Sequence, residues 1–119
     1  MGLDQYAYTK KGKDKVEIAY WRKHNALQGW MEKLWEEKGR PRQHKEDPSF
    51  NCVPLQLNRK NLDRLEKDVL NNELPETRGF FFGSDSREDD GYKQKTLEFV
   101  ANARQAIANG EKVFYSSWW

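Results

Sequence analysis

The sequence predicts a single α+β domain over residues 1–119, in which three helices pack on one face of a mixed β-sheet of about four to five strands. A chain of 119 residues suits one domain with one core. Segments with alternating apolar residues are separated by segments in which apolar residues recur every three to four positions. Five Trp, five Tyr and six Phe supply the large apolar side chains that a small core needs.

The N-terminal third predicts a β-hairpin followed by a helix. The strands are expected over residues 3–8 and 16–20, and the charged, glycine-containing stretch between them predicts a solvated turn. From about Asn25 the period becomes helical, and Gly39 followed by Pro41 ends this helix. Its apolar stripe consists of Leu27, Trp30, Met31, Leu34 and Trp35.

The middle of the chain predicts an exposed loop, an edge strand and a second helix. Residues 40–49 contain two prolines and almost no apolar side chain, which is typical of an exposed loop. Residues 50–57 alternate like a strand, and Pro54, which lacks an N–H donor, places that strand at an edge or a bulge. Asn58 can cap a helix that ends before Pro75.

Charged pairs at helical spacing are expected on the exposed face of this second helix. Arg64 and Asp68 lie four positions apart and carry opposite charges.

The last third predicts one short strand, one helix and a closing strand. Three adjacent phenylalanines at 80–82 favour a strand, and the acidic stretch 84–91 favours a loop. A weaker apolar stripe predicts a helix over 92–109, and 112–119 is expected to be the last strand.

The charges are nearly balanced. Twenty-one Lys plus Arg against nineteen Asp plus Glu give a formal charge of +2, and acids interrupt nearly every basic cluster. Because a nucleic-acid binder usually concentrates its cations, we do not expect nucleic acid as a partner.

The single cysteine and the apolar segments bear on the cellular compartment. Cys52 cannot form an intramolecular disulfide, which suits a reducing compartment, and we interpret it as a small buried hydrophobic residue. No signal peptide and no apolar run of about 20 residues is visible. We expect a cytoplasmic protein that does not enter a membrane.

The residues needed for metal binding or nucleophilic catalysis are few. The histidines are His24 and His44, and they show no metal-ligand spacing with the acids around them. A nucleophile, base and orienting carboxylate cannot be assigned from the sequence. We expect no metal and no cofactor, and we favour a non-enzymatic role while leaving activity open, because such sites can assemble from distant residues.

The first candidate site is the junction between the second strand and the first helix. It contains Trp21, Arg22, His24, Asn25 and Trp30. Free amides and the positive end of a helix dipole favour an anion there, with a tryptophan as a stacking surface. The alternative interpretation is structural, with His24 or Asn25 capping the helix and Trp30 in the core.

Asp4 also has a predicted partner at this junction. It shares one face of the first strand with Tyr6 and Tyr8, and a carboxylate among aromatic rings is costly unless it is paired. We expect a structural ion pair between Asp4 and Arg22.

The C-terminal strand is the second candidate site. Large aromatic residues lie on both of its faces, among them Tyr115, Trp118 and Trp119. If one face is exposed, these residues form a docking surface for a protein partner or a second copy of the chain. The alternative is that both tryptophans fold back and seal the core.

Four separated strings support a family resemblance. They are Met1-Gly2-Leu3-Asp4 with Tyr6, Tyr20-Trp21-Arg22-Lys23-His24-Asn25, Gly79-Phe80-Phe81-Phe82-Gly83-Ser84, and the terminal Trp118-Trp119. Together they resemble a family of small, poorly characterised proteins encoded by bacteriophages and prophages. The resemblance implies a phage protein that acts in the host cytoplasm.

The expected function combines this origin with the candidate sites. We expect a non-enzymatic accessory protein that binds a host protein and modulates host metabolism, transcription or defence. The alternative is a protein that binds or sequesters a small anionic metabolite or nucleotide, and a small hydrolase is the third hypothesis. A homodimer is compatible with each of them.

Overall fold

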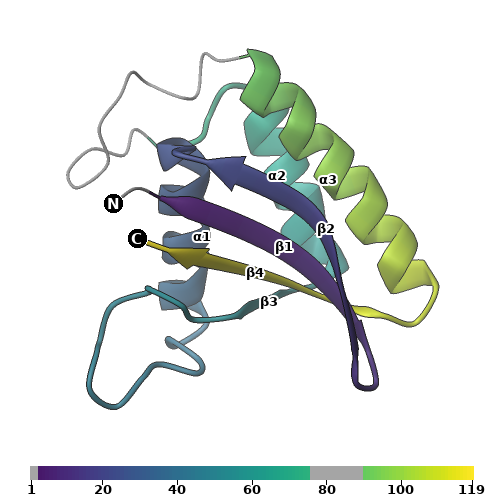
Figure 1. The fold of residues 1–119 in the computed structure, drawn as a ribbon. Helices are drawn as coiled ribbons and strands as arrows, with labels where there is room; N and C mark the ends of the chain where they lie inside the picture. The colour runs from purple at the N-terminus through teal and green to yellow at the C-terminus, as the bar shows by residue number, and fades with distance from the viewer. Residues whose placement is uncertain (1–2, 76–89) are drawn as a thin grey trace.

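The computed structural model describes residues 3–75 and 90–119. It has the predicted α+β architecture (Figure 1). The elements in chain order are β1 (Asp4–Lys11), β2 (Asp14–Arg22), α1 (Asn25–Glu37), β3 (Leu55–Leu57), α2 (Arg59–Leu70), α3 (Asp90–Ala108) and β4 (Lys112–Trp118). The strand predicted at 80–82 and most of the acidic loop at 84–91 lie outside the described residues.

The described strands form one sheet in the order β2-β1-β4-β3. Each neighbouring pair is antiparallel, so this sheet is antiparallel throughout, whereas the sequence predicted a mixed one. The reason is that β4 enters between β1 and β3 and runs opposite to both. Gly12 makes the turn between β1 and β2 with a φ of 63°, which favours glycine.

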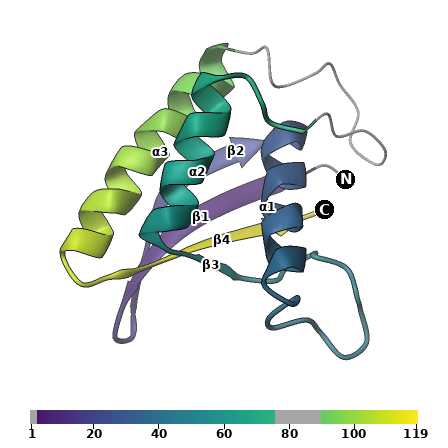
Figure 2. The same ribbon diagram turned by 180° about the vertical axis from the view of Figure 1, so that it is seen from behind.

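The three described helices cover one face of the sheet. Figure 1 shows the sheet in front of them, and Figure 2 shows the helices in front of the sheet. The core lies between these two layers and is rich in aromatic rings. Trp21 of β2 packs edge-on against Phe99 of α3 with ring centroids 5.2 Å apart, and Trp35 of α1 packs against Phe50 at 5.0 Å.

The opposite face of the sheet, which we call the open face, carries no helix of the described chain. Along β1, Gln5, Ala7 and Thr9 are buried against the helices, whereas Tyr6 and Tyr8 on the open face are only half-buried. This alternation follows from the two-residue period of a strand. The open face is therefore the surface on which β-strand side chains meet solvent.

The edge position of β3 confirms the prediction, but the strand is shorter than expected. Pairing begins only at Leu55, because Pro54 cannot donate a hydrogen bond and the backbone at Cys52 has a left-handed φ of 59°. The Cys52 amide donates to the Ser117 carbonyl at 2.7 Å, which holds this turn beside the end of β4. The Cys52 side chain is exposed, so its interpretation as a buried residue was wrong.

The second helix, α2, begins at the predicted cap, but its charged residues do not form the predicted pair. The Asn58 side chain accepts a hydrogen bond from the Asn61 amide, and the Asn61 side chain accepts one from the Asn58 amide. Arg64 binds Glu37 of α1 at 2.8 Å, and Asp68 accepts a hydrogen bond from the Trp30 indole at 2.8 Å. The expected pair within α2 is replaced by contacts that fasten α2 to α1.

Candidate functional site

The first predicted site, at the junction of β2 and α1, is almost entirely buried. Trp21 is 0% exposed, His24 1%, Asn25 4% and Trp30 5%. The indole of Trp21 donates to the Thr96 hydroxyl at 3.2 Å, and the His24 ring stacks on Tyr92 at 4.6 Å. Neither tryptophan therefore offers an exposed ring face on which a ligand can stack.

A buried polar network fills the same junction. Gln5 of β1 donates to the His24 carbonyl at 3.0 Å and accepts from the His24 amide at 2.9 Å. Gln5 also donates to the Tyr115 hydroxyl at 2.9 Å, which in turn donates to Gln28 at 2.6 Å. Burial raises the pKa of Tyr115 far above its usual value, so the hydroxyl remains a donor. The network joins β1, β4 and the start of α1.

The cap of α1 differs from the alternative interpretation of this junction. His24 is the N-cap residue, but its side chain makes no capping hydrogen bond. The His24 carbonyl instead accepts from the Gln28 amide at 3.1 Å and from Gln5. The helix start is held through the backbone.

Asp4 and Arg22, which were predicted to form an ion pair, are neighbours on adjacent strands but do not form one. The two residues are opposite each other in the register of β1 and β2. The Asp4 carboxylate accepts a hydrogen bond from the Tyr20 hydroxyl at 2.6 Å, and in the described ranges no ion pair joins it to Arg22. Arg22 is exposed, and its carbonyl accepts a hydrogen bond from the Tyr92 hydroxyl.

The C-terminal aromatic residues separate into buried and exposed positions. Tyr115 is fully buried in the polar network, and half-buried Trp119 packs against the core. The Trp119 amide donates to Asn51 at 3.0 Å. Trp118 is 59% exposed at the end of β4. Of the three predicted interface residues, Trp118 alone presents most of its side chain to solvent.

The open face brings together aromatic residues that are far apart in the sequence. Tyr8 of β1 and Phe114 of β4 are opposite each other, and their rings are nearly parallel with centroids 5.5 Å apart. Tyr6 and Tyr20 form a second pair across β1 and β2 at 5.3 Å. The two pairs place an aromatic layer across three neighbouring strands.

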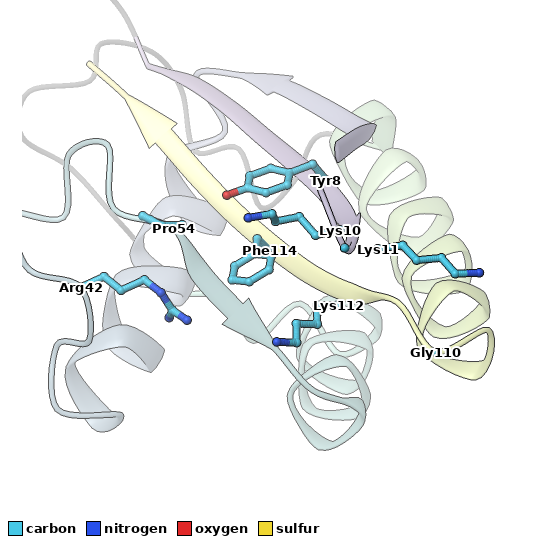
Figure 3. A pocket seen from close by; sticks show the side chains of 9 residues that line it. Tyr8, Lys10, Lys11, Arg42, Pro54, Gly110, Lys112 and Phe114 are labelled. Carbon is cyan, nitrogen blue, oxygen red and sulfur yellow. The ribbon is translucent and has the colours of Figure 1, made fainter. Parts of the chain in front are cut away.

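A hollow of about 420 Å³ lies beside the first of these pairs (Figure 3). Its lining consists of Tyr8, Lys10, Lys11, Gly12, Arg42, Pro54, Gly110, Lys112 and Phe114. Four of these nine residues are Lys or Arg, and no Asp or Glu of the described chain lines the hollow. This volume is in the range of small-molecule sites, so we call this hollow the cationic pocket.

Cations are also held over the aromatic rings. The Lys15 ammonium lies 4.1 Å from the centre of the Tyr8 ring, and the Arg42 guanidinium lies 5.5 Å from the centre of the Phe114 ring. Figure 3 shows Arg42 reaching from the loop between α1 and β3 toward Phe114, whereas Lys11 points away. Phe114 is 7% exposed.

The electrostatics of the pocket favour an anion. Burial raises the pKa of Tyr8, and the charge of Arg42 opposes part of this rise. The Tyr8 hydroxyl is therefore protonated at neutral pH. Ammonium, guanidinium and phenol groups are all donors, and phosphate or carboxylate oxygens are acceptors that match them.

Sequence reasoning identified parts of this face but not the pocket. The shared face of Asp4, Tyr6 and Tyr8 was predicted from the strand period. The pairing of Tyr8 with Phe114, 106 positions away, depends on the register of β1 and β4. Arg42 lies in the segment predicted as a loop, and its placement over Phe114 has no local signal in the sequence.

The described residues contain no group of three or more His, Cys, Asp and Glu side chains arranged to hold a metal ion. In the same residues, no helix has the length and apolar character needed to cross a membrane.

Comparison with known proteins adds no relative. No protein-family model matches the chain, and neither a curated protein nor a solved structure matches it.

Proposed function

We propose that the protein binds a small anionic ligand that carries a flat ring, such as a nucleotide, in the cationic pocket of the open face. The observation that carries this proposal is one hollow lined by the cations Lys10, Arg42 and Lys112 and by the aromatic rings of Tyr8 and Phe114. Phosphate groups pair with ammonium and guanidinium groups. The ring of the ligand packs against half-buried Tyr8, because Phe114 is only 7% exposed.

The location of the pocket differs from the site expected at the start of α1. Only the junction was predicted from the sequence as an anion site, and it is closed by the polar network around Gln5 and His24. The pocket is open to solvent. In the described ranges, Lys10, Arg42 and Lys112 take part in no ion pair.

Calorimetric titration with adenosine monophosphate, adenosine and pyrophosphate tests this proposal. We expect the monophosphate to bind and adenosine to bind more weakly, because it lacks the charge. The variant Lys10→Gln/Lys112→Gln should weaken monophosphate binding at least about tenfold, which corresponds to about 1.4 kcal/mol.

A matched control separates pocket binding from a general charge effect. Lys60→Gln/Lys95→Gln removes the same charge from exposed positions on α2 and α3. This control should retain the affinity of the unchanged protein. Equal weakening by both double variants, or no binding of any of the three compounds, would contradict the proposal.

Docking on a host protein is the second candidate function, and the exposure of Trp118 favours it. Aromatic residues of this kind often dominate protein interfaces, and Trp118 is 59% exposed. In this reading, the chain is a phage accessory protein that acts on a host protein in the host cytoplasm. It requires no enzymatic activity.

Native mass spectrometry of the gently purified protein tests this second function. A stoichiometric host chain should accompany the protein and be lost in Trp118→Ala. Leu70→Ala, a change at an exposed apolar residue on α2, should retain the partner. A bare monomer, or a partner retained by both variants, would contradict docking through Trp118.

A further inference from the structure

We propose that the open face binds single-stranded nucleic acid, with bases stacked on its aromatic layer and phosphates held by its cations. This inference rests on the proposed pocket and extends it, because a polymer contacts more of the face than one nucleotide does. Four-stranded sheets that carry aromatic residues on an uncovered face are one known platform for two or three unstacked bases.

The aromatic layer continues beyond the cationic pocket. Tyr6 and Tyr20 do not line the pocket, yet they follow Tyr8 along the same face. Tyr20 is 38% exposed, and Trp118, on the same side of β4 as Phe114, is 59% exposed. Because each base stacks on a single ring, this layer provides more stacking positions than one nucleotide needs.

The cations also continue beyond the pocket. Lys15, opposite Lys10 in the register of β1 and β2, extends the positive charge toward β2, the outermost strand of the described sheet on this side. On the other side, a second hollow of about 360 Å³ is lined by Arg42 together with Lys38. Arg42 lines both hollows. Because the Lys38 ammonium already donates to the Gln56 carbonyl and to Asn61, the cationic path that we consider runs from Lys15 past Lys10 and Lys112 to Arg42.

The fold separates charges that are mixed along the sequence. On the helices, Arg104 pairs with Glu66 and Asp63 at 2.7 Å, and Arg64 pairs with Glu37. Within the described residues, the open-face cations Lys10, Lys15, Arg42 and Lys112 form no ion pair. A total charge of only +2 therefore coexists with a locally positive face.

Two acids, Glu17 and Asp4, also lie on the open face, but neither lines one of the two hollows. Glu17 is opposite Tyr8 in the register of β1 and β2, and Asp4 is opposite Arg22 at the far end. The Asp4 carboxylate is occupied by the Tyr20 hydroxyl. We therefore expect the phosphates to follow the path from Lys15 to Arg42.

The aromatic layer favours single strands over duplexes. In a duplex, both faces of each base are covered by neighbouring base pairs, and only base edges are accessible in the grooves. Stacking on Tyr6, Tyr20 or Trp118 requires a base that has left such a stack. A single strand exposes its bases at lower cost.

Fluorescence anisotropy with labelled oligonucleotides tests the inference. The probes are an eight-nucleotide oligo-dT, the equivalent oligo-U, a blunt DNA duplex of eight base pairs, and labelled adenosine monophosphate. We expect a single strand to bind at least about tenfold more tightly than the monophosphate and the duplex. The oligo-dT and oligo-U arms distinguish DNA from RNA, and tight binding of either supports the inference.

A ring substitution outside the pocket distinguishes this inference from the proposed function. Tyr20→Ser removes a stacking surface and should weaken oligonucleotide binding about tenfold without changing monophosphate binding. Tyr20→Phe also loses the hydrogen bond to Asp4 but keeps the ring, so it should retain oligonucleotide binding. Circular dichroism and urea unfolding of both variants check that the fold is unchanged.

Each other outcome has a separate meaning. If the monophosphate binds but the oligonucleotide binds no more tightly, or if Tyr20→Ser has no effect, the polymer inference is overturned and the pocket remains. Tight duplex binding, or equal loss in Tyr20→Phe, also overturns it. If no probe binds, both proposals fail.

Discussion

The buried hydroxyl of Tyr115 permits a quantitative test of the junction between the sheet and α1. Tyr115→Phe removes one oxygen atom and leaves the ring in place. The Tyr115 hydroxyl accepts from Gln5 and donates to Gln28. Gln5 keeps its bond to the His24 carbonyl after the change, but Gln28 loses its partner. The substitution therefore leaves a buried amide oxygen without a hydrogen bond.

The expected cost follows from this arrangement. Gln28 is 2% exposed, and its Nε2 already has no partner among the described residues. Leaving a buried polar group unsatisfied costs about 1–3 kcal/mol, so we expect the free energy of unfolding to fall by about 2 kcal/mol. Urea denaturation followed by tryptophan fluorescence measures it.

Two further variants show whether the cost comes from the Tyr115–Gln28 hydrogen bond. Tyr8→Phe removes a hydroxyl that has no hydrogen-bond partner in the described residues, and it should cost less than about 0.5 kcal/mol. Tyr115→Phe/Gln28→Leu removes both partners of the hydrogen bond. Its loss of unfolding free energy should be smaller than the sum of the losses in Tyr115→Phe and Gln28→Leu. Equal effects of Tyr115→Phe and Tyr8→Phe would refute the assignment of the network.

Three other predictions concern charge, thiol exposure and the hairpin turn. The Arg104 hydrogen bond lowers the pKa of Glu66 below its usual value of 4.5. The pair therefore stabilises the fold above pH 4.5, and this stabilisation is lost as the pH falls through the lowered pKa. Glu66→Gln should lower Tm at pH 7, and the difference in Tm should disappear toward pH 2. Because both partners are partly exposed, we expect a loss below about 1 kcal/mol. Exposed Cys52 should react with a thiol reagent in the native protein nearly as fast as in urea, whereas slow native reaction would contradict its position. Gly12→Ala should destabilise the fold by about 1 kcal/mol, because Gly12 has a φ of 63°, and Lys13→Ala should have a smaller effect in the same urea assay.

The elements with strong local signals were predictable from the sequence. The helical period from Leu27 to Trp35 led to α1 at Asn25–Glu37, and the alternation around the charged turn led to the hairpin. The length of β3 was less predictable, because the backbone turn at Cys52 has no residue that signals it. Whether neighbouring strands run parallel or antiparallel depends on where β4 enters the sheet. That position is set by contacts between distant segments and has no local sequence pattern.

The candidate site was harder to predict because it depends on contacts between distant segments. The tryptophans and His24 near α1 have a sequence pattern that fits either an anion site or a core, and burial places them in the core. Tyr8, Phe114 and Arg42 come from three separate segments. Their proximity follows from strand register and loop path, neither of which leaves a local pattern in the sequence.

The separation of charges in the fold was also not predictable from the sequence. A count over the chain gives nearly equal numbers of acids and bases, which led us to expect no nucleic-acid partner. The fold pairs Arg64 and Arg104 with acids of the helices and leaves the lysines of the open face without such pairs among the described residues. The net charge of a chain does not report this separation.

The most direct test of the central claim is an NMR titration of the isotope-labelled protein with adenosine monophosphate. We predict that the largest amide shift changes occur at Tyr8, Lys112 and Phe114, while the amide shifts of Leu62 and Ala103 on the helix side do not change. Changes centred on His24 at the start of α1, or no saturable change anywhere, would contradict the claim that the open face holds the binding site.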